Sequence, residues 1–172
     1  MLNMNISRSI LISGLLIGAS VLFGSSAKAD TTGTVPLSGT VNPTLALTAT
    51  PNGTASALPL DGAAAGAEQI QKVAGLNVET NNTLGYTLTV SSGNLAEPKG
   101  DTIAYQVVVK DTATAAVSGD FQVASGTDYT YATTAANAAV DGNRDLYIRY
   151  TPRALQNPGA YTSTINLSVK DN

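Results

Sequence analysis

The chain has 172 residues and a formal net charge of −3, and it contains neither cysteine nor histidine. Disulfides and thiol chemistry are therefore excluded, and the commonest general base and the usual ligands of transition metals are missing. Charged residues make up 12% of the chain and its few Lys and Arg residues are scattered, so we expect no nucleic-acid partner.

The first 29 residues have the features of a secretory signal peptide. Arg8 precedes an apolar run at residues 10–24, and Ala27-Lys28-Ala29 then supplies the small-x-small pattern that a signal peptidase accepts. We expect cleavage before Asp30. The apolar run is shorter than the roughly 20 residues that a spanning helix needs, and no second run follows. The sequence therefore predicts an exported protein whose mature part, residues 30–172, does not span a membrane.

Beyond the signal, apolar and polar residues alternate with period two in several short segments, which is typical of half-buried β-strands. The clear candidates are residues 84–91, 103–110, 144–151 and 161–170. Weaker candidates are residues 44–50, 55–60, 73–80, 119–124 and 127–133. Turn-forming groups such as Ser92-Gly93-Asn94 separate the segments, and we interpret the Ala-rich residues 63–65 and 135–139 as loops. This pattern predicts an all-β sandwich or barrel.

Few residues in this sequence suggest chemistry. The segment Asp141-Gly142-Asn143-Arg144-Asp145 has oxygen ligands spaced like the start of a calcium loop, but the later ligand positions do not match, and a solvated turn is the favoured interpretation. We expect no catalytic residue, no cofactor and no metal site. Tyr129 and Tyr131 are the best candidates for exposed aromatic side chains that bind a sugar.

The segment at residues 34–41 also alternates, and Asn42-Pro43 separates it from the next predicted strand. Pro36 within it cannot donate a ladder hydrogen bond and therefore needs an edge position. One face of this segment carries Val35, Leu37, Gly39 and Val41.

Residues 34–50, TVPLSGTVNPTLALTAT, resemble the mature N-terminus of the alpha-class chaperone–usher pilins, the colonisation-factor major subunits of enterobacteria. Val41-Asn42-Pro43 stands where those pilins have Val-Asp-Pro. Residues 158–169, PGAYTSTINLSV, resemble the closing strand of those pilins and of the spore-coat-U-like secreted pilins. The lack of cysteine fits the alpha class better. These motifs, with residues 78–95, cover only part of the chain.

The resemblance implies an immunoglobulin-like antiparallel β-sandwich, residues 44–172, that lacks a strand and is completed by the N-terminal extension, residues 30–43, of another copy. It implies a surface fibre or fimbrium, with copies of the chain and a periplasmic chaperone as partners. Pro43 would be the hinge. The donor face would be Val35, Leu37, Gly39 and Val41, and the acceptor groove would be lined by Tyr161, Ile165, Leu167 and Val169.

Energetics favour a partner for the last strand. The chain ends three residues after Val169, so we expect no later strand to pair with it. Seating about three large side chains of the extension would contribute about 5–9 kcal/mol, against a typical domain stability of about 5–15 kcal/mol.

Three alternatives stay open on the sequence alone. Residues 34–41 are equally compatible with the first strand of their own sandwich, because a strand pattern does not distinguish pairing within a chain from pairing between chains. A self-complete, adhesin-like secreted sandwich would bind a glycan or a surface protein. A hydrolase would need two carboxylates that meet in a cleft.

Overall fold

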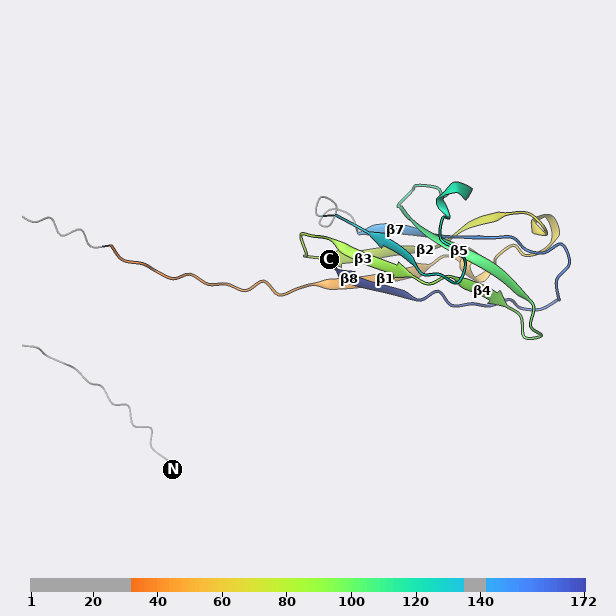
Figure 1. Ribbon diagram of the computed structural model, residues 1–172, viewed down its shortest axis with the longest axis horizontal. Helices are drawn as coiled ribbons and strands as arrows, with labels where there is room; N and C mark the ends of the chain where they lie inside the picture. Colours follow the sequence, from red (N-terminus) through yellow and green to blue (C-terminus); the bar gives the residue numbers. More distant parts are fainter. Residues whose placement is uncertain (1–31, 135–141) are drawn as a thin grey trace, which may run out of the picture. The chain divides into compact units, whose positions relative to one another are not determined.

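A computed structural model of the protein describes residues 32–134 and 142–172, and Figure 1 shows the arrangement of the strands. The compact unit comprises Thr40–Asn172, whereas residues 32–39 belong to a separate unit. The predicted signal peptide, the Ala-rich residues 135–139 and Asp141 lie outside the described residues.

The larger sheet of the compact unit is antiparallel and has five strands in the order β1-β2-β7-β5-β4. The longest pairing joins β2 to β7, with a register shift between Lys72 and Ala74. The strands are β1 (Leu45–Pro51), β2 (Gln69–Thr80), β4 (Gly93–Ala96), β5 (Thr102–Asp111) and β7 (Asn143–Tyr150).

The smaller sheet is also antiparallel and has three strands in the order β6-β3-β8. They are β3 (Tyr86–Val90), β6 (Tyr129–Ala132) and β8 (Leu167–Asp171). Alternate residues of β3 are buried, because each second side chain of a strand points to the same face. These side chains pack with those of β2, β5 and β7 in one hydrophobic core, so the prediction of an all-β sandwich is confirmed.

Most predicted strands are present with bounds shifted by one or two residues, and β2 begins four residues earlier than expected. Two predictions are wrong, because residues 55–60 and 119–124 contain no strand. Short 3₁₀ helices lie there instead, η1 (Gly53–Ser56) and η3 (Ser118–Asp120). The Asn52 side chain accepts from the Ala55 backbone N–H at 3.1 Å, and Asp120 accepts from Val117 at 2.9 Å. Such local bonds compete with strand pairing.

The structure corrects three further details. β4 was missed because Gly93-Asn94 has a turn composition, yet Asn94 lies opposite Ala104 of β5. The predicted strand at residues 161–170 is shorter, since only its second half forms β8 and its first half makes a single bridge, Thr162 to Ala96. The predicted loop at residues 63–65 overlaps a 3₁₀ turn, η2 (Gly62–Ala64).

Side-chain hydrogen bonds link β6 of the smaller sheet to β5 and β7 of the larger one. The Tyr131 hydroxyl donates to Asp111 at 3.2 Å and accepts from Arg144 Nε at 2.9 Å.

No helix in the described residues is long and apolar enough to cross a membrane.

Candidate functional site

The N-terminal segment that carries the predicted donor face is extended and exposed. Residues 32–44 have no strand assignment, and β1 begins only at Leu45. The side chains of Val35 and Leu37 are 82% and 91% exposed. Val41, at the start of the compact unit, is 85% exposed. Large apolar side chains therefore stand in solvent along the predicted donor face, and Gly39 between them is exposed as well.

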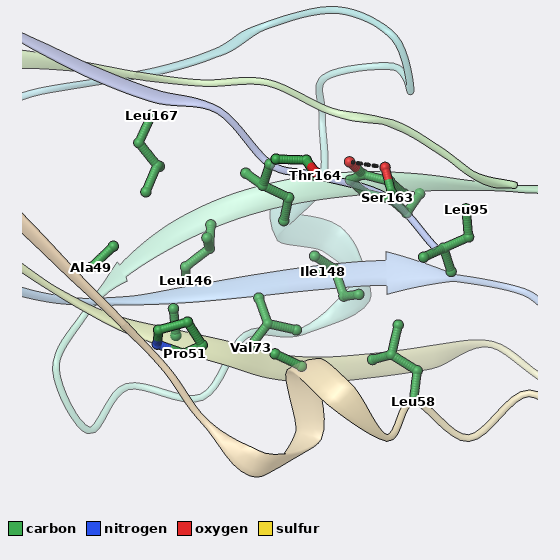
Figure 2. A pocket seen from close by; sticks show the side chains of 14 residues that line it. Ala49, Pro51, Leu58, Val73, Leu95, Leu146, Ile148, Ser163, Thr164 and Leu167 are labelled. Carbon is green, nitrogen blue, oxygen red and sulfur yellow. Dashed lines mark hydrogen bonds between the residues drawn. The ribbon is translucent and has the colours of Figure 1, made fainter. Parts of the chain in front are cut away.

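An apolar groove of about 300 Å³ opens in the compact unit, on the side of the sandwich where β1 and β8 lie. Figure 2 shows side chains converging on it from both sheets. Its floor is formed by β2, β4, β5 and β7, whose buried side chains also belong to the core. The lining residues are Ala49, Pro51, Ala55, Leu58, Val73, Ala74, Leu95, Tyr105, Leu146, Ile148, Ser163, Thr164, Ile165 and Leu167.

The strands that border this groove each have a free edge. Within the described residues, β1 pairs only with β2, and β8 pairs only with β3. A strand at a sheet edge presents a row of unpaired N–H and C=O groups, which is a template for pairing with another strand. The groove therefore has the two features that an added strand needs, apolar pockets and main-chain hydrogen-bonding edges.

A second hollow of about 390 Å³ continues the groove toward the loop before β8. Both hollows share Ala55, Leu58, Leu95 and Ser163. The second one adds Gly159 and Tyr161, so the two together follow the chain from Gly159 to Leu167. An elongated occupant fits this shape better than a compact one.

Three of the four predicted acceptor residues line the groove or the second hollow, and Val169 does not. Ile165 and Leu167 line the groove, and Tyr161 lines the second hollow. Val169 pairs opposite Leu88 and packs against the core. Sequence reasoning missed the floor of the groove, Leu146 and Ile148, because period-two alternation marks them as core residues and gives no sign that one side of the core is open.

Asp101 holds the segment that leads into the groove wall. It accepts hydrogen bonds from the Tyr161 hydroxyl at 2.7 Å and the Asn157 backbone N–H at 3.1 Å, and Arg153 pairs with it at 2.8 Å. The Tyr161 bond is the largest cause that lowers the pKa of Asp101 below its usual 3.8. Burial, followed by the same hydrogen bond, raises the pKa of Tyr161 to about 12, so the phenol stays a donor.

Replacing Asp101 with Asn is expected to remove part of the acid dependence of stability. The folded-state pKa of Asp101 is lowered. Its contribution to folding stability is therefore present above about pH 3.8 and is lost as the pH falls through the folded-state pKa. Urea unfolding between about pH 7 and pH 2 should show wild type more stable than Asp101→Asn at neutral pH, with the difference shrinking in acid. Asp128→Asn, in an exposed position before β6, serves as control. A pH-independent difference between wild type and Asp101→Asn would contradict this assignment.

Tyr129 and Tyr131 are not the exposed aromatic pair that the sequence predicted. Both are partly buried and pack against the core from β6. Burial raises the pKa of each hydroxyl. The Tyr131 ring also lies under the Arg144 guanidinium, 5.5 Å from the ring centroid. Their period-two spacing places both side chains on the inner face of β6, which explains the correction.

The predicted calcium-like segment is not a solvated turn in its described part. Asn143, Arg144 and Asp145 belong to β7, and Asp145 is 3% exposed. Lys72 Nζ lies 2.6 Å from the Asp145 carboxylate, which also accepts from the Ala113 backbone N–H. The described residues contain no group of three or more acidic side chains that could hold a metal ion.

No protein family, curated protein or solved structure matches this chain.

Proposed function

We propose that this chain is a non-enzymatic structural subunit of a surface fibre or pilus-like assembly, joined by insertion of its N-terminal extension, residues 30–43, into the groove of another copy. One observation carries the proposal: an apolar groove lies between the end of the edge strand β1, at Ala49 and Pro51, and residues 163–167, which lead into the edge strand β8. It bears on assembly because an open groove leaves both apolar surface and backbone groups without partners.

The extension has the chemistry that the groove requires. Its exposed Val35, Leu37 and Val41 fall on one face of an extended segment, because alternate side chains of a strand point the same way. The opposite face carries Thr34, Ser38 and Thr40, which would remain in water. Strand addition gains affinity from main-chain hydrogen bonds and specificity from pockets for alternate side chains. Gly39 would suit a place where the groove is narrow.

Head-to-tail insertion has a defined consequence for assembly. The donor and acceptor surfaces are different parts of the chain, so each added copy leaves a new groove open, and a repeat that does not close makes a fibre. An unassembled subunit with an empty groove would need a temporary partner, and we propose a periplasmic chaperone in that role. The fibre would lie at the cell surface or in the extracellular medium.

The proposal is tested by light scattering after size-exclusion chromatography of residues 30–172 and of the same chain without residues 30–41. The longer form should give multimers that increase with concentration, and the shorter form should give monomers. A synthetic peptide of residues 30–43 should bind the shorter form and raise its melting temperature. A monomeric longer form, together with a shorter form that ignores the peptide, would refute the proposal.

A further inference from the structure

The junction between the extension and β1 is held by Asn81. The Asn81 side-chain amide donates to the Asn42 carbonyl at 2.7 Å, and its oxygen accepts from the Thr44 N–H at 2.8 Å. The Asn81 backbone N–H adds a bond to the Thr44 carbonyl at 3.2 Å. Asn81 directly follows β2, whose last residue, Thr80, pairs with Leu45. One side chain thus fixes the backbone on both sides of Pro43.

This contact matters because the chain could otherwise complete itself. The groove face of β1 carries Ala49 and Pro51, both odd-numbered, as are Val35 and Leu37 of the extension. Opposite residues of a hairpin share a face, so only a loop with an odd number of residues brings these side chains together. A three-residue loop at residues 42–44 would place Leu37 opposite Ala49 and Val35 opposite Pro51.

The sequence of that loop opposes such a hairpin. The common three-residue hairpin is a type I turn followed by a residue with positive φ, usually glycine. A residue before proline is disfavoured in the helical region, which acts against Asn42 in the first position. Proline is disfavoured in the second position, and the β-branched Thr44 in the third.

We propose that Asn81 and Pro43 together direct the extension into the groove of a second copy of this chain and prevent it from folding back into its own. This inference rests on the proposed function. Turning at residues 42–44 would break the Asn81 bonds to Asn42 and Thr44, because both residues would have to leave their present backbone conformation. Asn81 is therefore a positioning residue for assembly.

The test uses the absence of cysteine, which allows a clean cross-linking pair in residues 30–172. Ser38→Cys lies on the outer face of the extension, and Ser168→Cys is exposed on β8. A short bismaleimide is added to this double-cysteine parent and to three variants of it. Two variants carry Asn81→Ala, or Pro43→Asp with Thr44→Gly. The third, Asn94→Ala, is the control, because Asn94 is an exposed asparagine of β4. Denaturing gels separate cross-links between chains from those within a chain.

We expect a ladder of intermolecular products in the parent and in the Asn94→Ala control. Asn81→Ala should raise the ratio of intramolecular to intermolecular product roughly tenfold, as the loss of two hydrogen bonds implies. The double substitution Pro43→Asp with Thr44→Gly supplies a favourable turn and should shift the ratio in the same direction without touching the Asn81 side chain. A role limited to stability would lower the melting temperature without this conversion.

The outcomes separate this inference from the proposed function. An unchanged intermolecular ladder in both variants overturns the role of Asn81 and Pro43 while insertion between copies stands. Mainly intramolecular product in the parent overturns both, because the extension would then occupy the groove of its own chain. If no background gives either product and the peptide of residues 30–43 does not bind, insertion fails and this inference fails with it.

Discussion

Replacing Leu37 with Asp is expected to weaken multimerisation of residues 30–172 more than about a hundredfold. Leu37 is the most exposed side chain of the predicted donor face, at 91%. In the assembled fibre it would enter an apolar groove, where burial of a leucine contributes about 1.5–3 kcal/mol. An aspartate would lose that contribution and would also bring an unpaired charge into the groove. Sedimentation or light scattering over a range of concentrations measures the effect.

The matched control is Ser38→Asp, the same charge placed one residue later. Because adjacent residues of a strand face opposite sides, position 38 would remain in solvent after insertion. We expect Ser38→Asp to multimerise like wild type. Equal loss of multimers in both variants would indicate that charge alone, and not burial of Leu37, determines the result, and the proposed donor face would be wrong.

Truncating Leu88 to Ala is expected to cost about 2–5 kcal/mol of stability and to lower the melting temperature by about 10 °C or more. Leu88 is the central residue of β3 and is 0% exposed, with Val169 of β8 and Tyr131 of β6 opposite it. Its removal would leave a cavity where the smaller sheet packs on the larger one. A domain of this size is stable by only about 5–15 kcal/mol, and here one side of its core is open.

Leu155→Ala removes the same atoms from a side chain that is 92% exposed. We expect a change within about 0.5 kcal/mol for this control. Urea unfolding followed by circular dichroism gives both values. If Leu88→Ala were as mild as Leu155→Ala, β3 could not pack against the larger sheet through a buried Leu88.

Locally patterned features could be predicted from the sequence. Period-two alternation located β1, β3, β5, β6 and β7, because an amphipathic strand carries its burial pattern in its own residues. The failures occur where local and long-range interactions compete. Gly93-Asn94 has the composition of a turn but pairs as a strand with β5. Residues 119–124 alternate, but they begin inside a 3₁₀ turn that Asp120 stabilises.

The candidate site could likewise be predicted only in part from the sequence. The sequence by itself determined the alternating, proline-interrupted extension and its apolar face, since those properties belong to contiguous residues. Only the tertiary structure decided that β1 and β8 lie at sheet edges beside an apolar groove and that Ile148 of β7 and Ile165 both line it. It also decided that Asn81, 37 and 39 positions from its two partners, holds the junction between the extension and β1. Contacts at such separations depend on the order of strands in a sheet, which a single strand's pattern does not encode.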